Sequence, residues 1–456
     1  MHFLDLLGFF SANIVPAAAL SGVSLLNVLL PRSPHRRWSC QCDALRNVWF
    51  FPKTHLTLPS SPMAYPYPHD SCNPLLEPHS PCTLDYHAVF SINATGLSDI
   101  QARIRFPRKH NFRLAIRNTG HDYLGKSPGA HSLFLWTKHL KSFSFLEKYK
   151  GLKYIGPAIK MGAGMGGIEA YWFANFSWPL GSGRQLPDLR LPLTLGGGHG
   201  PFSLKYGLAA EQSLYLSMTV KAVPDNHFST AYITAPDNGT NTKSIYFALM
   251  KFLGALPGIV IAVVSAMWVA APFGSMLMPA FGPGLRQDDI DKLLRCTLER
   301  MDNLGLEDQY PYSEFPTFLS ADNSLTSSWN VSDYNIGGRL TDNLDGLNSV
   351  SLVSDVAVNP YFRETLFSAV VGTPIDYNGL ASNQAAQDKL TNDLLPLLAK
   401  LTPKGAAYLN EADFQQPDFK WAFYGDHYEK LFVIKQKYDS HDIPYTKTAV
   451  GGDRRM

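Results

Sequence analysis

Hydrophobic and polar positions along the chain predict strands mainly in its first half and amphipathic helices mainly in its second. Short apolar runs typical of strands occur at 89–92, 112–117, 132–136, 153–156 and 214–222. Residues 98–106 follow a helical period instead, with Ser98 as a candidate N-cap and Pro107 as a stop signal. The sequence therefore predicts a strand–helix–strand unit that leads into the segment after residue 117.

Longer helical periods predominate from about residue 226. Helices are predicted at 168–176, 243–254, 287–303, 384–401 and 428–438, with a strand-like run at 349–358. The stretch between Lys251 and Arg286 has no charged residue and is strongly apolar at 259–273. Four prolines interrupt this stretch, which favours buried strands and turns over a continuous helix. We therefore expect no stable membrane span.

The composition is that of an ordinary globular protein. At 456 residues, the chain is long enough for two or three domains with large cores. Its formal net charge is +2, and no cluster of lysine and arginine forms a candidate nucleic-acid surface. A nucleic-acid partner is therefore not expected, and no pattern in the sequence indicates an oligomeric state.

The N-terminal part of the chain points to the secretory pathway. Residues 1–20 are apolar enough for a signal peptide, with small residues at 17–19 that suit cleavage, although Asp5 interrupts them and they contain no Lys or Arg. Residues 21–80 are rich in proline and serine and are predicted to be irregular. Asn-x-Ser/Thr sequons stand at Asn93, Asn175, Asn238 and Asn330. We expect a secreted glycoprotein.

Cysteine usage agrees with an oxidising compartment. Four of the cysteines lie in the first 82 residues; the full set is Cys40, Cys42, Cys72, Cys82 and Cys296. Cys40 and Cys42 are poorly placed to bond to each other, so their pairing with Cys72 and Cys82 is the simplest oxidised arrangement. A zinc site is the alternative, but the spacings differ from the usual finger patterns. Disulfides are therefore favoured.

Two glycine-framed histidines carry the most specific chemical signal. The first stands in the run Arg117-Asn118-Thr119-Gly120-His121-Asp122-Tyr123-Leu124-Gly125, directly after a predicted strand. The second stands in the run Gly196-Gly197-Gly198-His199-Gly200. Glycine allows backbone conformations and a close ligand approach that larger residues prevent. A strand that ends in such a turn places one side chain beyond the edge of the sheet, where it can line a site.

Three other patterns lead to different interpretations. Gly162 to Gly167 fits the dinucleotide motif G-x-G-x-x-G, which would indicate a Rossmann NAD(P) dehydrogenase but leaves both histidine loops without a role. The two loop histidines, with Asp122 and His139, are candidate metal ligands, but their spacing is not that of ligands on a rigid element. Gly125 to Gly129 matches G-x-S-x-G, yet Pro128 lacks the N–H that an oxyanion hole requires.

A flavin site accounts for both histidine loops. Glycine-rich loops supply converging backbone N–H groups to the pyrophosphate of FAD, and an imidazole beside the flavin ring can bond to its 8α-methyl carbon. The run from Arg117 to Tyr123 resembles the flavin-attachment loop of the berberine-bridge-enzyme-like FAD-linked oxidases, in the vanillyl-alcohol-oxidase/p-cresol-methylhydroxylase superfamily. The second loop, with Tyr206-Gly207-Leu208-Ala209-Ala210, is similar to their second FAD loop.

The C-terminal part of the chain carries a third match to this family. The matching runs are Tyr408-Leu409-Asn410-Glu411, Tyr424-Gly425-Asp426-His427-Tyr428 and Lys435-Gln436-Lys437-Tyr438-Asp439. They are similar to the family's segment that returns to the flavin domain. The three motifs stand in the family's order, span about residues 72–450, and resemble those of fungal isoamyl-alcohol-oxidase-like members.

The resemblance implies an α+β fold in three parts. These are an FAD-binding domain of two subdomains, of the p-cresol methylhydroxylase type, at 81–225, a substrate domain with an antiparallel sheet and helices at 226–404, and a returning segment at 405–450. His121 would carry the FAD covalently. The other residues implied to line the cofactor are Asn118, Thr119, Gly120, Asp122, Tyr123, Gly125, Gly197, Gly198, His199, Gly200, Tyr206 and Gly207. The Gly162–Gly167 turn would belong to the FAD-binding domain.

Two departures from the family pattern bear on FAD binding. Many members form a second bond to FAD from a cysteine before the triple glycine, but no cysteine lies between Cys82 and Cys296, so attachment would be through His121 only. Residues 184–192 replace the family's small residues with two arginines, an aspartate and two prolines. A gene-model error would explain this segment and the charged end at 452–456. The alternative to an active oxidase is a secreted glycoprotein of the same fold that has lost its flavin.

The resemblance places the catalytic residues in the returning segment. Family members often have a tyrosine as base after the asparagine of this motif, and Glu411 takes that position here. A carboxylate serves as a base if burial raises its pKa towards neutrality; the alternative is a solvent-facing side chain. Tyr408 and Asn410 are candidates for orienting the substrate, Tyr408 also for the base. The expected enzyme takes a hydride from an alcohol-type or secondary-metabolite small molecule to FAD and is reoxidised by O₂.

Overall fold

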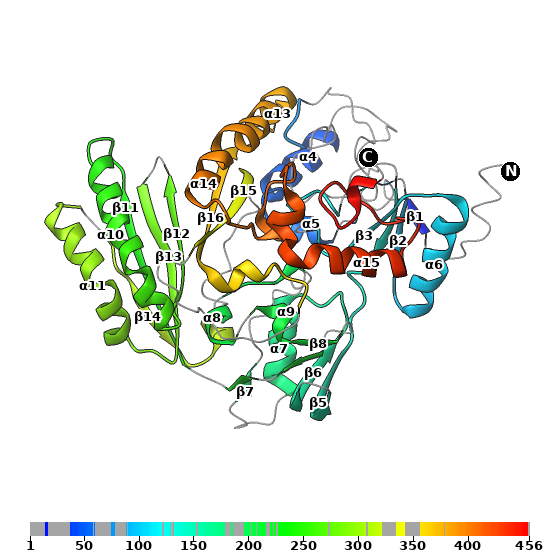
Figure 1. Cartoon of the computed structure of the whole chain (residues 1–456), viewed down its shortest axis with the longest axis horizontal. Coiled ribbons are helices and arrows are strands. Elements are labelled where there is room, and N and C mark those ends of the chain that lie inside the picture. The colour runs from blue at the N-terminus through cyan, green and yellow to red at the C-terminus, as the bar shows by residue number, and fades with distance from the viewer. Residues whose placement is uncertain are drawn as a thin grey trace.

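Figure 1 shows the computed structural model of the chain. It describes residues 14–16, 37–57, 59, 74–77, 88, 90–120, 123–127, 129, 132–151, 154–177, 184–185, 196–200, 202–206, 208–215, 219–221, 223–224, 227–271, 274–306, 309–321, 334–342, 356–377 and 379–454. The predicted pairing partners Cys72 and Cys82 lie outside these residues. Parallel and antiparallel sheets, each with its own helices, make up the described part, and the predicted α+β fold class is confirmed by the solved structures reported below.

The predicted strand–helix–strand unit is present in the first sheet. The strands of this sheet, in order across it, are β1 (Ile14–Pro16), β2 (Phe90–Asn93), β4 (Leu133–Trp136) and β3 (Leu114–Arg117). The connecting helix is α6 (Leu97–His110). Because β4 lies between β2 and β3 and runs parallel to both, β3 stands at the edge of the sheet. The first histidine loop therefore leaves from an edge strand.

The predicted ends of α6 were wrong. The helix starts after Gly96 rather than Ser98, and it continues through Pro107 to His110. Pro107 lacks an N–H, but it lies in the last turn, and its carbonyl still accepts the N–H of Asn111. The helix ends at Asn111, whose left-handed backbone (φ 53°) is a common helix terminator.

A second, antiparallel sheet completes the N-terminal half. Its order is β5 (Phe143–Lys150), β6 (Ile155–Met161), β9 (Thr219–Lys221) and β8 (Ser213–Tyr215). Next to it lie α7 (Gly167–Ser177), the short helices α8 (Ser203–Tyr206) and α9 (Ala209–Gln212), and the pair β7 (Arg184–Gln185) and β10 (Val223–Pro224). The Gly162–Gly167 turn follows β6, which is antiparallel to both of its neighbours. A Rossmann site requires a parallel βαβ unit, so this arrangement contradicts the dinucleotide interpretation.

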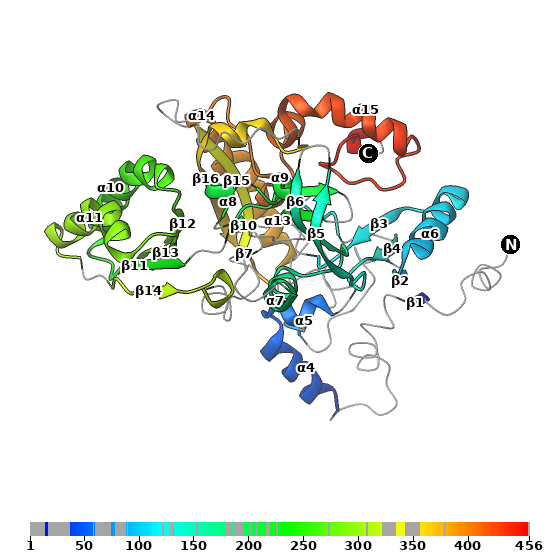
Figure 2. The same cartoon turned by 90° about the horizontal axis from the view of Figure 1, so that it is seen from below.

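A third sheet forms the lobe at the left of Figure 1. Its order is β12 (Ser265–Ala271), β13 (Gly274–Pro283), β11 (Phe228–Pro236) and β14 (Tyr312–Phe315), all antiparallel. The helices α10 (Thr242–Ile261) and α11 (Gln287–Asn303) form a layer on one face of it (Figure 2). The antiparallel pair β15 (Tyr334–Asp342) and β16 (Thr365–Pro374) lies between this lobe and the rest of the molecule (Figure 1).

Helix α10 differs from its prediction. It continues through Pro257 to Ile261, where strands and turns were expected, and only the following residues form the hairpin of β12 and β13. Its buried residues lie three or four apart, at Ile245, Ala248, Phe252, Leu256 and Ile259. Among the described helices, α10 is long and apolar enough to cross a membrane by length and composition. Here its buried stripe packs in the core of the lobe.

Further helices pack around the β15–β16 pair and at the N-terminal side. They are α4 (Arg37–Val48), α5 (Pro52–Leu56), the 3₁₀ turn η2 (Pro360–Glu364), and the continuous run of α13 (Leu380–Lys389), η3 (Leu390–Leu394) and α14 (Leu395–Leu401). The last run confirms the helix predicted at 384–401. Of the strand predicted at 349–358, residues 349–355 lie outside the described residues, and 356–358 are not a strand.

The C-terminal segment crosses the molecule from the β15–β16 pair to the first sheet, as the orange-to-red ribbon of Figure 1 shows. Its elements are η4 (Leu409–Glu411), η5 (Lys420–Tyr424), η6 (Gly425–His427), α15 (Tyr428–Tyr438) and η7 (Gly452–Arg454). The N–H of Leu114 in β3 donates to the carbonyl of Ile443 at 3.5 Å, and Arg113 lies over the ring of Tyr445. The segment therefore contacts the strand that leads into the first histidine loop.

Candidate functional site

The second glycine loop is held in a conformation that requires glycine. Gly197 and Gly198 have φ angles of 131° and 71°, in the region that side chains disfavour. Their carbonyls accept the N–H groups of Ala210 and Ala209 at 2.9 and 2.8 Å, at the start of α9. The N–H of Gly200 donates to Ser203 Oγ at 2.8 Å. The loop is thereby fixed at both ends.

Three residues of the returning segment converge on this loop. Tyr408 is completely buried, and its hydroxyl oxygen accepts the N–H of Gly198 at 3.0 Å and an N–H of the Asn410 side chain at 2.6 Å. A Cβ atom on Gly196 would lie 2.2 Å from Asn410 Oδ1. Only glycine at this position leaves room for the Asn410 side chain. The predicted catalytic residues and the second loop therefore form one site.

His199 and Glu411 face each other at the rim of this site. The distance from His199 Nε2 to Glu411 Oε1 is 3.0 Å, and the two side chains are 38% and 24% exposed. The His199 ring also meets the Tyr408 ring edge to face, with centroids 4.9 Å apart. Both groups are therefore oriented by contacts and still accessible to a small molecule.

Tyr408 is held as a neutral phenol. Burial raises the pKa of Tyr408 to about 12, and the nearby Glu411 carboxylate acts in the same direction. The hydrogen bonds from Asn410 and from the backbone at Gly198 and His199 lower the pKa, but they do not outweigh burial. At neutral pH Tyr408 is thus a hydrogen-bonding and packing group.

The first loop is described on both sides of its histidine, while His121 and Asp122 lie outside the described residues. Trp136 Nε1 donates to the carbonyl of Asn118 at 3.2 Å, and the Asn118 amide donates to the carbonyl of Ala163. Ala163 belongs to the Gly162–Gly167 turn, so that turn packs against the first loop. The next residue, Thr119, is buried.

Further along the first loop, the backbone and packing are also defined. Gly120 and Gly125 have φ angles of 90° and 67°, which favour glycine. Leu124 belongs to the same buried cluster as Ala407 and Ala412 of the returning segment. Tyr123 is half-buried, Gly207 lies outside the described residues, and of Tyr206 only the backbone is described, in α8. The returning segment thus contacts both histidine loops.

Two buried oxygen atoms in the first loop bear on whether a polar ligand fits there. Asn118 Oδ1 and Thr119 Oγ1 are buried and have no hydrogen-bond partner among the described residues. Such atoms are costly unless a partner satisfies them. A cofactor that has many polar atoms, such as FAD, meets this requirement. The residues present therefore fit FAD.

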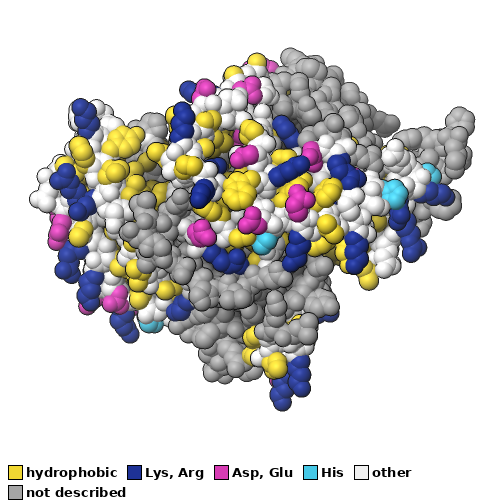
Figure 3. Space-filling model, viewed as in Figure 1, with side chains coloured by type: hydrophobic (Ala, Val, Ile, Leu, Met, Phe, Trp, Pro, Cys, Tyr) yellow, Lys and Arg dark blue, Asp and Glu magenta, His cyan; other side chains and the backbone are white. Residues whose placement is uncertain are grey.

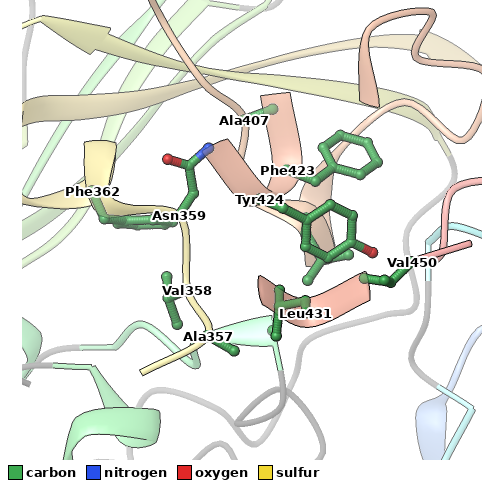
Figure 4. Close-up of a pocket in the computed structure, with 11 residues that line it drawn as sticks. Ala357, Val358, Asn359, Phe362, Ala407, Phe423, Tyr424, Leu431 and Val450 are labelled. Carbon is green, nitrogen blue, oxygen red and sulfur yellow. The ribbon is translucent and has the colours of Figure 1, made fainter. Parts of the chain in front are cut away.

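An apolar cavity of about 200 Å³ lies beside the returning segment (Figure 4). It is lined by Gly196, Ala357, Val358, Asn359, Phe362, Ala407, Leu409, Phe423, Tyr424, Leu431 and Val450. The side-chain amide of Asn359 donates to the carbonyls of Trp421 and Ala422, and the Tyr424 hydroxyl donates to the carbonyl of Thr448. The polar groups of the wall are thus bonded to backbone.

Sequence reasoning missed two buried polar residues that support the site, Asn359 and Asp413. Asn359 also accepts the N–H of Tyr361, and an asparagine before a proline is a helix-start signal that could have identified it. Asp413 gave no signal, because its partners on α13 and η3 are distant in the sequence. Of the candidate metal ligands, His139 bonds to Asn93 Oδ1, and the described residues contain no group of three metal-binding side chains.

Comparison with known proteins agrees with this geometry. The family described as "Berberine and berberine like" matches residues 407–448, most of the returning segment. The FAD-linked oxidoreductase sor8 of Hypocrea jecorina is 30% identical over 484 aligned residues, which cover 91% of this chain and 84% of that protein.

Solved structures share the fold. The VAO-type flavoprotein MtVAO615 from Myceliophthora thermophila C1 superposes with a TM-score of 0.84 at 24% identity and covers 99% of this chain and 94% of its own. The glucooligosaccharide oxidase of Acremonium strictum has a TM-score of 0.62 at 15% identity, over 80% and 92%. This chain therefore belongs to the berberine-bridge-enzyme-like family of FAD-linked oxidoreductases, within the vanillyl-alcohol-oxidase superfamily.

Proposed function

We propose that this protein is an FAD-dependent oxidase that converts an alcohol-type carbon of a small molecule to a carbonyl. The observation that carries the proposal is the convergence of Tyr408, Asn410, Glu411 and His199 on the glycine loop Gly196–Gly200. When bound, FAD supplies the acceptor for the substrate hydride, and O₂ returns it to the oxidised form. The protein supplies orientation, a proton acceptor and exclusion of water.

Each residue of the site has a defined task in this proposal. Asn410 and Tyr408 form a rigid hydrogen-bonded pair that shapes the floor of the site. Glu411 and His199, which are partly exposed, are the groups within reach of a substrate hydroxyl, and one of them takes its proton. In the sequence, some of the site residues precede β15 and the others follow β16. The site therefore forms when the chain folds.

We further propose that FAD is attached covalently through His121 alone. The glucooligosaccharide oxidase of Acremonium strictum carries a 6-S-cysteinyl, 8α-N1-histidyl FAD. This chain has a histidine in the corresponding type of loop and no cysteine between Cys82 and Cys296. A single histidyl bond follows, together with ordinary hydrogen bonds to Asn118 Oδ1 and Thr119 Oγ1 of the loop.

Absorbance spectroscopy tests whether the protein binds FAD and whether His121 attaches it. The purified protein should be yellow and should stay yellow after acid denaturation, and His121→Ala should release all of the flavin on denaturation. His441→Ala, at an exposed histidine far along the chain, is the matched control and should keep the bound flavin. A folded but colourless wild-type protein would instead support the flavin-free glycoprotein.

Secretion remains a proposal of its own. It rests on the apolar residues 1–20, the early cysteines and the four sequons. Expression in a fungal host should yield protein in the medium whose mass falls after endoglycosidase treatment. Retention inside the cell without glycans would contradict it.

A further inference from the structure

The pairing of His199 with Glu411 has a chemical consequence for the site. Among the described residues, the titratable groups placed against the His199 ring are Glu411, whose Oε1 lies 3.0 Å from Nε2, and Tyr408, whose ring it meets edge to face. A carboxylate only accepts hydrogen bonds, so a neutral His199 must carry its proton on Nε2 to make this contact. In that tautomer the lone pair is on Nδ1.

Both partners are held in place by backbone contacts. The N–H of Glu411 donates to the carbonyl of Tyr408 at 2.9 Å, which closes the turn of η4. Gly338 of β15 lies directly against the Glu411 carbonyl, since a Cβ there would be 2.4 Å from it. His199 stands between Gly198 and Gly200, whose positions the hydrogen bonds of the loop determine. The ring and the carboxylate therefore meet in one defined arrangement.

We propose that His199 is the proton acceptor of the oxidation, and that Glu411 is a positioning residue that fixes the His199 tautomer. This inference rests on the proposed function and deepens it. The substrate O–H bond breaks, and its proton forms a bond to His199 Nδ1. The carbon–hydrogen bond breaks with its electron pair, and the hydride goes to the FAD that the proposed function supplies. The product is a carbonyl compound, and the imidazolium that results is stabilised by the Glu411 carboxylate.

The proton acceptor in this proposal is the His199 imidazole and not the Glu411 carboxylate or the Tyr408 phenol. The Tyr408 oxygen is buried and already accepts two N–H groups, so its lone pairs are engaged. One carboxylate oxygen of Glu411 faces His199. The His199 side chain is 38% exposed and the Glu411 side chain 24%, so the imidazole is the more exposed group of the pair. An imidazole that a carboxylate orients is also the base arrangement of the serine hydrolase triads.

The test compares His199→Ala, Glu411→Gln and the surface control His441→Ala in the flavin-loaded protein, with 3-methylbutan-1-ol and benzyl alcohol as substrates. Stopped-flow absorbance gives the rate of flavin reduction by each alcohol. We expect His199→Ala to lower this rate by about 10²–10⁴-fold and added imidazole to restore part of it. His441→Ala should behave as wild type.

The pH dependence separates the two roles. Reduction should need neutral His199, so the rate should rise with pH in the wild type. Because the Glu411 charge favours the imidazolium, Glu411→Gln should move the midpoint of this rise to lower pH and lower the plateau only moderately. The assignment would be overturned if Glu411→Gln abolished flavin reduction while His199→Ala kept both the reduction rate and its pH midpoint. That result would leave the proposed function intact.

A second readout does not depend on turnover. In protein labelled with ring-¹⁵N histidine, the His199 signals, identified by their loss in His199→Ala, should show the Nε2–H tautomer in the wild type. In Glu411→Gln this preference should weaken. A wild-type Nδ1–H tautomer would overturn the inference whether or not either alcohol reduces the flavin. Failure of both alcohols alone counts against the proposed function.

Discussion

Asp413 lies two residues beyond Glu411 and is completely buried. Its carboxylate accepts hydrogen bonds from Gln387 Nε2 at 2.8 Å, Thr391 Oγ1 at 2.7 Å and the N–H of Gln415 at 2.7 Å. Burial raises the pKa of Asp413, and these three hydrogen bonds and the positive charge of Lys447 act in the opposite direction. At the scale of single residues, Asp413 connects the turn that contains Glu411 to the helix run of α13 and η3.

Replacement of Asp413 by alanine should destabilise the fold. The change leaves buried donors on Gln387 and Thr391 without their acceptor, so we expect a loss of about 3 kcal/mol in the free energy of unfolding. Urea denaturation followed by tryptophan fluorescence measures it. Asp388→Ala is the matched control, because Asp388 is exposed and accepts a hydrogen bond from Gln384 on the same helix; it should change stability by less than about 0.5 kcal/mol. Equal effects of the two substitutions would contradict this role of Asp413.

The same residue predicts a pH dependence with a definite sign. Because the pKa of Asp413 is higher in the folded than in the unfolded state, the folded state binds more protons, and this contribution to stability falls as pH rises from about 4, the ordinary aspartate value. In Asp413→Asn the group no longer titrates. The stability of the wild type minus that of Asp413→Asn should therefore decrease between pH 4 and 7, and an increase would contradict the direction of the shift.

At the scale of elements, helix periods were predicted well, and the ends that were predicted wrongly are those of two helices that contain a proline. Helices α11 and α15 have the predicted bounds, whereas α6 and α10 pass through Pro107 and Pro257. A proline in the last turns of a helix removes one hydrogen bond, and tertiary burial of the apolar stripe outweighs this loss. The sequence around a helix carries no information on that burial, so it predicts the end of the helix too early.

The parts of the site were predictable, but their contacts were not. The loop of Gly196 and the turn of Glu411 each carry a recognisable motif. Their contact joins Gly198 to Tyr408 and His199 to Glu411, more than two hundred residues apart in the chain. Such pairings depend on how the β15–β16 pair and the returning segment pack, and no local periodicity encodes this.

Helix α10 offers a stability test at this scale. Its outward face carries exposed apolar side chains, including Tyr246, Phe247 and Met250, on the lobe at the left of Figure 3, where hydrophobic and basic side chains both gather. On the same helix Gly254 is exposed, and a Cβ atom there would meet no atom within 4 Å. Glycine in a helix interior is costly because the unfolded chain has more freedom.

We expect Gly254→Ala to stabilise the protein by about 0.5–1 kcal/mol. Thermal unfolding measured by circular dichroism should show a higher midpoint, with bound flavin unchanged. Gly196→Ala provides the contrast, because its new Cβ would lie 2.2 Å from Asn410 Oδ1. A lower midpoint for Gly254→Ala would mean that this face of α10 is covered in solution.

At the scale of the whole molecule, residues 452–454 contact earlier parts of the C-terminal segment through ion pairs. Arg454 pairs with the buried Asp442, and Lys420 pairs with Asp453 at 2.7 Å. A Cβ on Gly452 would lie 2.0 Å from the carbonyl of Thr446, so this glycine permits a tight turn. Residues 452–454 are thus packed against the part of the chain that contains Lys420 and Asp442.

Arg454→Ala should therefore loosen the returning segment. Among the residues that the structure describes, the substitution leaves Lys435, 3.9 Å away, as the cation paired with the buried Asp442 carboxylate, so we expect a cost of about 1–3 kcal/mol. Since Ile443, the residue after Asp442, bonds to β3, the amides of this region should exchange with solvent faster, as hydrogen-exchange mass spectrometry would show. Arg295→Ala, at an exposed position of α11, is the control and should leave exchange unchanged. Unaltered protection near Ile443 in Arg454→Ala would show that apolar packing alone holds the segment against the flavin domain.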